Sequence, residues 1–165
     1  MFYSELGVPD TVDGRFDLVS LHVFLILQRL RKESRKAKRT AQALFNHMFV
    51  DMDLSLREQG VGDLSIPRYI RRMMQAFNGR CLAYASALDA ANGDDLADAL
   101  ERNIYAGQGM PGQAERIALT GYVRQCADLI SHQPLDALLE GDVQFIGKVK
   151  DESVAIHASD AGMVA

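Results

Sequence analysis

Charged side chains interrupt an otherwise apolar stretch in the middle of the chain. At roughly 100° per residue, Asp51 and Asp53 fall about 90–110° to either side of a helical apolar stripe centred near Met52. Arg80 falls inside the apolar stripe of the next segment, where an unpaired guanidinium would be costly. Arg80 therefore needs a carboxylate partner, and the local candidates are Asp51, Asp53 and Asp63. The pair either fixes how two helices dock or holds a partner molecule, and both roles stay open.

The other reactive residue types do not assemble into a catalytic or metal site. The string at residues 107–112 reads G-x-G-x-x-G, but no strand precedes it and Pro111 is typical of a helix start, so we interpret it as a loop. A metal site needs three or four convergent ligands, whereas the histidines are scattered. We expect no enzyme activity, metal or cofactor, a hydrogen-bonded histidine at position 22, and two reduced, buried thiols. The residues concerned are His22, His47, His132, His157, Cys81 and Cys126.

Basic residues gather in two stretches, residues 28–39 and 68–72, of which the first has seven Lys or Arg and one acid. A positive charge in the first turn of a helix opposes its dipole by ~0.3–1 kcal/mol, so helix stability does not account for these residues. They predict one positive surface for an anionic partner, namely ribosomal RNA, acidic lipid headgroups or an acidic protein, and the alternative is a solvated face. The basic set comprises Arg29, Arg31, Lys32, Arg35, Lys36, Lys38, Arg39, Arg68, Arg71 and Arg72.

The whole chain repeats this asymmetry of charge. Residues 1–80 carry 13 Lys or Arg against 9 Asp or Glu, whereas residues 81–165 carry 5 against 13. The start of the chain has neither a secretory signal nor an Arg-rich leader, and the apolar run Leu18–Leu27 is about half the ~20 residues that a membrane-spanning helix needs. We therefore expect a cytoplasmic protein with one basic, partner-facing end, and no DNA partner.

Apolar residues recur at helical spacing along most of the chain and predict an all-α fold of about five to six helices. Val12–Leu30 is apolar on two faces, which is typical of a central helix. Gly60 ends the next helix, and the short connection that follows makes Ala41–Leu88 an antiparallel hairpin at the centre of a compact bundle. Val50 and Leu54 lie opposite the main stripe, either under another helix or exposed to a partner. We expect a helical domain over residues 1–142 and an irregular or mobile tail over residues 143–165.

Three stretches of this sequence, LHVFLILQRLR, ALFNHMFVDMDLSLREQGVGDLSIP and FNGRCLAYASAL, together resemble the ubiquinol–cytochrome c chaperone family, the assembly factors of the cytochrome bc1 complex. The similarity runs from Phe16 to Leu139 and is densest between Leu44 and Leu88. Its signature is D-x-D-x-x-x-R-E-x-G-V-G-D followed by F-x-G-R and a tyrosine. Asn78 stands where a tyrosine is common in the family.

The resemblance implies a non-enzymatic chaperone that binds newly made cytochrome b at the inner face of the inner membrane. Mitochondrial members work with a small partner protein at the ribosomal tunnel exit, whereas this chain looks more like a bacterial member. A ribosome- or RNA-binding helical module is the alternative function. Carried over by position, the candidate structural or client-binding motif comprises Asp51, Asp53, Arg57, Glu58, Asp63, Phe77, Arg80 and Tyr84, with Gly60, Gly62 and Gly79 beside them.

Overall fold

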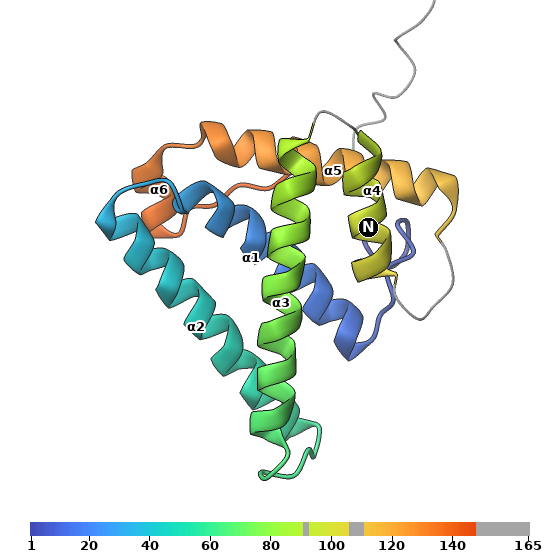
Figure 1. The fold of residues 1–165 in the computed structure, drawn as a ribbon, viewed down its shortest axis with the longest axis vertical. Coiled ribbons are helices and arrows are strands. Elements are labelled where there is room, and N and C mark those ends of the chain that lie inside the picture. Colours follow the sequence, from blue (N-terminus) through green and yellow to red (C-terminus); the bar gives the residue numbers. More distant parts are fainter. Residues whose placement is uncertain (91–92, 106–110, 148–165) are drawn as a thin grey trace, which may run out of the picture.

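The first helix of the protein crosses behind a long hairpin made by the second and third helices (Figure 1). The structure is a computed structural model that describes residues 1–90, 93–105 and 111–147. Within these residues it contains six α-helices and no strand, which confirms the predicted all-α class. The helices are α1 (Val12–Leu30), α2 (Arg35–Glu58), α3 (Ile66–Asp89), α4 (Gly93–Ile104), α5 (Gln113–His132) and α6 (Leu135–Glu140).

Helix α1 is the centre of the molecule, as its two apolar faces predict. The hydroxyl of Thr11 accepts a hydrogen bond from the backbone N–H of Gly14 and so caps the start of the helix. The helix then packs against α2, α3, α4 and α5. Leu21 and Phe24 are buried among these neighbours, and the removal of their apolar surface from water stabilises the fold.

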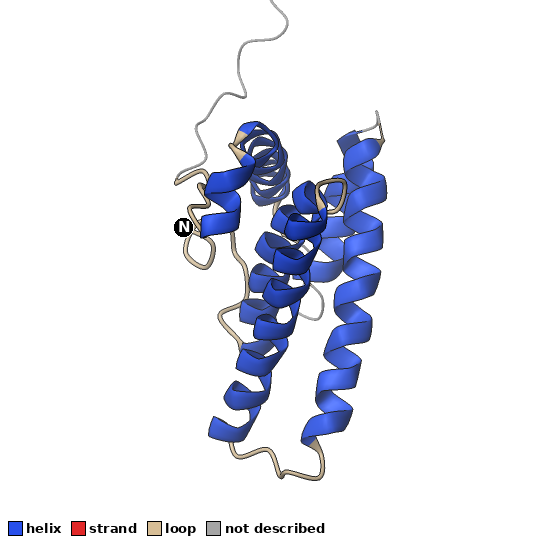
Figure 2. Cartoon of the chain, turned by 90° about the vertical axis from the view of Figure 1, so that its left-hand side faces the viewer, coloured by secondary structure: helices blue, strands red, loops and turns tan. Residues whose placement is uncertain are grey.

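Helices α2 and α3 form the predicted antiparallel hairpin. Ser34 caps the start of α2, and Gly60, with φ +80°, lets the chain turn after its end because glycine adopts this left-handed conformation without strain. In the view of Figure 1 the two helices converge toward their connecting loop, and both views show that the loop projects beyond the other helices (Figures 1 and 2). The rings of Phe49 and Phe77 lie 6.0 Å apart, which shows which turns of the two helices face each other.

Two groups of buried apolar side chains hold the helices together. The smaller group, which we call the hairpin cluster, joins α1 to the hairpin through Phe16, Val23, Met48, Phe49 and Phe77. The larger group, the main core, lies between α1, the second half of α3, α4, α5 and α6, and it includes Ala37 at the start of α2. Helices α1 and α3 contribute to both groups, so the hairpin is anchored at one end and free at the other.

The segments that flank the helices also pack on the main core. Leu6 and Val8 are buried before α1 begins, and the hydroxyl of Tyr105 donates a 2.7 Å hydrogen bond to the carbonyl of Leu6. Residues 143–147 form neither helix nor strand, yet the ring of Phe145 lies 4.9 Å from that of His22. The remainder of the expected tail, residues 148–165, and most of the glycine-rich string lie outside the described residues. No helix in the described part of the chain is long and apolar enough to cross a membrane.

Candidate functional site

An apolar groove of about 360 Å³ lies between α2 and α3 near the free end of the hairpin. Aromatic and aliphatic side chains of both helices line it, and two polar residues stand among them. Val50 and Leu54, which the periodicity placed opposite the main stripe, are 55% and 53% exposed. No other helix of the described chain covers them. The lining comprises Phe45, Asn46, Phe49, Val50, Asp53, Leu54, Ile70 and Met74.

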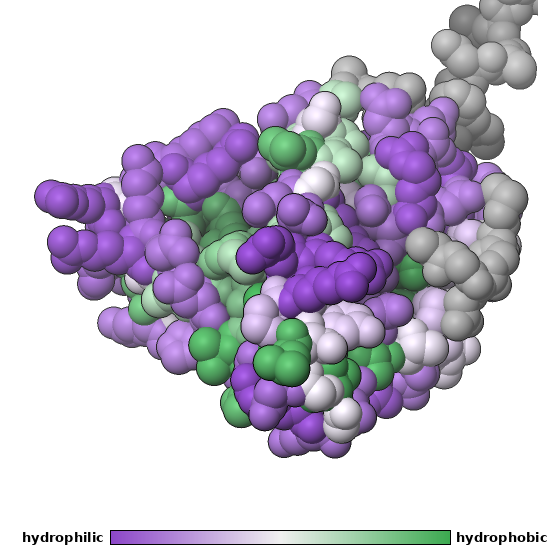
Figure 3. Space-filling model, turned by 60° about the horizontal axis from the view of Figure 1, so that its bottom comes forward, coloured by the Kyte–Doolittle hydropathy of each residue, from purple (hydrophilic) through white to green (hydrophobic). Residues whose placement is uncertain are grey.

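Exposed apolar side chains also lie at the loop end of the hairpin. Leu64, in the loop, is 99% exposed, and Tyr69 in the first turn of α3 is exposed as well. Figure 3 looks toward this end of the molecule and shows apolar side chains beside strongly hydrophilic ones. Single exposed apolar residues are ordinary, but a contiguous group of them on one end of a protein is typical of an interaction surface.

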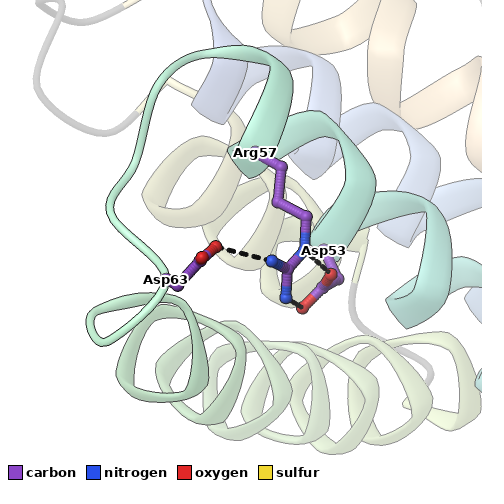
Figure 4. A network of polar contacts seen from close by, with 3 residues as sticks. All are labelled: Asp53, Arg57 and Asp63. Carbon is purple, nitrogen blue, oxygen red and sulfur yellow. Dashed lines mark hydrogen bonds and ion pairs between the residues drawn. The ribbon is translucent and has the colours of Figure 1, made fainter.

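An ion-pair network closes the loop of the hairpin (Figure 4). Arg57 in the last turn of α2 donates from Nε to Asp53 one turn earlier at 2.6 Å, and from Nη1 to Asp63 in the loop at 2.7 Å. The hydrogen bond to Asp53 is the main reason that the pKa of Arg57 is raised above its usual value. The spacing of four residues between Asp53 and Arg57 was the sequence signal for half of this network.

Arg80 does not pair with Asp51, Asp53 or Asp63, so the prediction of its partner was wrong. Its Nη2 lies 2.6 Å from Oδ1 of Asp17 on α1, and its guanidinium carbon lies 5.5 Å from the centre of the Phe16 ring. Arg80 lies about 20 Å along α3 from the loop end of the hairpin, because a helix rises 1.5 Å per residue. It therefore faces α1, which crosses there, rather than the acids near the loop.

The Asp17–Arg80 pair is enclosed by the packing of the helices. Side-chain exposures are 9% for Asp17 and 16% for Arg80. Burial raises the pKa of Asp17 to about 6, although Arg80 opposes that rise and Asp13 adds to it. Nε and Nη1 of Arg80 are buried without a hydrogen-bond partner in the described part of the chain. A buried pair of this kind suits the docking of helices, and leaving one partner alone would be costly.

The remaining motif residues divide between core and surface. Phe77 is buried in the hairpin cluster, and Tyr84 is fully buried with its ring 5.5 Å from that of Phe24. Asp51 and Glu58 are exposed on α2. The motif is therefore not one site: part of it builds the hairpin, and part of it lies on the surface near the groove.

The structure separates the predicted basic surface into two patches. The residues at 29–39 surround the junction of α1 and α2, whereas those at 68–72 lie in the first turns of α3, beside the opposite end of α2 (Figure 1). Arg29 pairs with Glu33, and Arg31 lies 4.0 Å from Asp89. The first patch keeps five exposed cations that make no ion pair within the described residues, namely Lys32 before α2 and four residues in the first turns of α2. The four on α2 are Arg35, Lys36, Lys38 and Arg39.

His22 is a hydrogen-bonded residue at the edge of the main core, as predicted. Nδ1–H donates to the carbonyl of Leu18 at 2.7 Å, which leaves Nε2 to accept from the hydroxyl of Tyr122 at 2.7 Å. Burial lowers the pKa of His22, so the neutral ring is favoured. Among the described residues no three His, Cys, Asp or Glu side chains converge as metal ligands. Cys81 and Cys126 are both free thiols, and burial raises the pKa of Cys81 to about 11.

Comparison with known proteins shows to which family the chain belongs. The family model for the ubiquinol–cytochrome c chaperone matches residues 4–145, most of the chain. The chain belongs to the ubiquinol–cytochrome c chaperone family. The resemblance seen in the sequence is thus confirmed, and the family's role in assembly confirms the prediction that the chain is not an enzyme.

Individual members of the chaperone family agree with this assignment. The crystal structure of the Cbp3 homolog from Brucella abortus superposes with a TM-score of 0.77 at 38% identity, covering 88% of this chain and 79% of that chain. Ubiquinol-cytochrome-c reductase complex assembly factor 1 of Xenopus laevis is 27% identical over 94% of this chain and 77% of that protein. The Mus musculus assembly factor 1 is 28% identical over 87% of this chain but only 48% of that protein, so the chain spans about half its length.

Proposed function

We propose that this chaperone binds newly made cytochrome b through the groove between α2 and α3, and that it does so at the inner face of the inner membrane during assembly of the ubiquinol–cytochrome c reductase complex. The observation that carries the proposal is the uncovered apolar groove with Val50 and Leu54 on its rim. The named relatives are assembly factors of that complex, which supports the choice of client.

The chemistry of the groove suits an apolar helical client. An amphipathic or apolar helix binds by laying anchors spaced three or four residues apart into an apolar groove between two helices. Phe45 and Phe49 supply large, stiff surfaces, and Met74 supplies a flexible thioether that adapts to different side chains. Asn46 and Asp53 at the edges offer polar contacts that orient the bound segment.

The test is a complementation experiment in a strain that lacks the gene. We expect the deletion to lower the amount of assembled reductase complex while the cytochrome b transcript stays unchanged. Wild type should restore the complex, and Val50→Asp should not, because a carboxylate in the groove rejects an apolar helix. Leu82→Asp is the matched control, since Leu82 is 75% exposed on α3 and does not line the groove.

Two further measurements test whether the variants fold and which protein they bind. Circular dichroism must show that both variants fold, and a photo-crosslinker at position 50 should capture cytochrome b from native membranes. Normal amounts of the complex in the deletion strain would refute the assembly role. Restoration by Val50→Asp as strong as that by wild type would refute the groove as the client site.

The second candidate function, contact with the ribosome or its RNA, rests on the four exposed cations at the start of α2. No acid of the described residues pairs with them, and the first turn of α2 contains no acid. Its signature is RNA binding that weakens steeply with salt and is lost when Arg35, Lys36, Lys38 and Arg39 are neutralised. RNA binding that survives this change would exclude the patch.

A further inference from the structure

The end of the hairpin combines a fully exposed leucine in its loop with positive charge on α3. We call residues 61–72 the hairpin tip. Leu64 is 99% exposed in the loop, which projects beyond the other helices (Figure 2), and the exposed Tyr69 follows it in the first turn of α3. The tip adjoins the apolar groove through Ile70, which belongs to the tip and lines the groove.

The positive charge of the tip is not used by the fold. Arg68, Arg71 and Arg72 are exposed, lie on the side of α3 opposite its buried stripe, and form no ion pair within the described residues. The first turn of α3 contains no acid, so the helix dipole repels these cations rather than holding them. The nearest loop acid, Asp63, is already bound by Arg57. Three arginines therefore face solvent beside the loop that carries Leu64.

We propose that the hairpin tip docks on an anionic phospholipid bilayer, with Leu64 inserted among the headgroups and the three arginines on lipid phosphates. Proteins that bind a bilayer peripherally combine the insertion of apolar side chains with the attraction of cations to anionic lipids. Neither a single apolar side chain nor a few cations hold a protein on a bilayer alone. A guanidinium binds phosphate oxygens in bidentate fashion, which suits Arg better than Lys. Docking in this orientation places the open groove at the bilayer surface, where an apolar client segment leaves the lipid.

The inference rests on the proposed function only for the membrane setting, because vesicle binding needs no client. The chain has no tryptophan, so Leu64→Trp gives a single tryptophan, excited apart from the tyrosines at 295 nm or above, at the tip of an otherwise wild-type protein. Leu82→Trp is the matched control, an equally conservative change at another exposed leucine of the hairpin, on the second half of α3. Both proteins are titrated with vesicles of phosphatidylcholine alone and with vesicles that contain one third phosphatidylglycerol.

With the anionic vesicles, we expect the emission of Leu64→Trp to shift to the blue and to be quenched by lipids with brominated acyl chains. Leu82→Trp should show neither change while it sediments with the same vesicles. Phosphatidylcholine alone should bind at least about tenfold more weakly, because it offers the arginines no net charge. No binding to anionic vesicles, or equal shifts for the two tryptophans, would overturn the proposal.

Charge variants test the arginines separately. Arg68→Gln, Arg71→Gln and Arg72→Gln combined should weaken vesicle binding by about tenfold or more, because each cation near the surface contributes to adsorption. Arg35→Gln, Lys36→Gln and Arg39→Gln combined remove the same charge at the other end of α2 and should leave binding within about twofold. Equal losses from both sets would overturn the proposal, as would a preference of the tip arginines for RNA over vesicles.

The groove variant distinguishes this inference from the proposed function. Val50→Asp should keep full binding to anionic vesicles while it fails to restore the reductase complex. If wild type binds anionic vesicles but the photo-crosslinker at position 50 captures no cytochrome b, the proposed client site fails while the membrane contact stands. Client capture with no vesicle binding would do the reverse.

Discussion

Asp17 and Arg80 form an ion pair where α1 crosses α3, and packing excludes most water from it. Burial of the carboxylate costs more than the neighbouring guanidinium returns, which is why the pKa of Asp17 is raised to about 6. We interpret the pair as a device that fixes the crossing of the two helices rather than as a large source of stability. Removal of one partner therefore destabilises the protein mainly because the other charge stays buried without a counterion.

Arg80→Ala should lower the free energy of unfolding by about 3–5 kcal/mol at pH 8, because it leaves the carboxylate of Asp17 buried alone. Urea denaturation followed by circular dichroism measures the loss. The double variant Asp17→Leu with Arg80→Met should recover most of it, since it removes both charges and keeps the apolar volume. A double variant no more stable than Arg80→Ala would show that the charge left behind is not the cause.

Asp17 also predicts a dependence of stability on pH. Its pKa is about 6 in the folded protein against 3.8 for the ordinary side chain, so the folded state holds a proton that the unfolded state releases. The contribution of Asp17 to stability is therefore present below pH 4 and is lost as the pH rises through 6. Relative to Asp17→Asn, which cannot titrate, wild type should lose free energy of unfolding between pH 4 and pH 7. A constant difference between the two proteins over that interval would contradict this assignment.

Among the helices, α1 and α3 differ in how closely their glycines are packed. A Cβ added to Gly14 in the first turn of α1 would lie 2.0 Å from the carbonyl oxygen of Pro9, so the segment before the helix would have to move. A Cβ added to Gly79 on α3 would meet nothing within 4 Å. Gly79 therefore lowers the stability of the helix, and no packing among the described residues requires a glycine there.

Gly14→Ala should destabilise the protein by about 1–3 kcal/mol, since it forces the packed N-terminal segment away from α1. Gly79→Ala should raise stability by about 0.5–1 kcal/mol, because alanine loses less backbone entropy in a helix. Thermal unfolding of the two variants beside wild type measures both changes. Each glycine variant is the control for the other. Stability changes of the same sign in both would contradict the packing described for one of the two sites.

At the scale of the whole molecule, the hairpin cluster and the main core are not independent. Helix α1 supplies Phe16 and Val23 to the first and Leu21 and Phe24 to the second. Helix α3 likewise contributes Phe77 to the hairpin cluster and Tyr84 to the main core. Two cores that share two helices should melt together, because neither can lose its packing while the shared helices keep theirs.

We therefore expect one cooperative unfolding transition that changes in the hairpin cluster affect as a whole. Phe49→Ala should lower the free energy of unfolding by about 3–5 kcal/mol, since it empties a buried aromatic position. Circular dichroism reports all the helices. In a Tyr69→Phe background, which removes the tyrosine of the hairpin tip, tyrosine fluorescence reports the main core through Tyr84, Tyr105 and Tyr122. The two transitions should move together in this variant. An earlier transition in circular dichroism, with tyrosine fluorescence unmoved, would show that the hairpin unfolds by itself.

The sequence by itself determined the helices and the family. Apolar periodicity is a local property of a chain, so the two-faced pattern of Val12–Leu30 and the turn at Gly60 were sufficient to predict α1 and the hairpin. The exposed Val50 and Leu54 could also be identified, as residues opposite a stripe. The family signature needed only the order of residues along the chain.

Only the tertiary structure decided what these residues face. Arg80 required an acid, but which acid it meets depends on the angle at which α1 crosses α3, and no periodicity encodes that angle. The sequence predicted one basic surface because all the basic residues concerned lie in the first half of the chain. In the structure, the 24 residues of α2 separate them into two patches. The length of α2 thus separates two groups of cations that the sequence analysis treated as one surface. The crossing of α1 and α3 brings Asp17 and Arg80 into contact although they are far apart in the sequence.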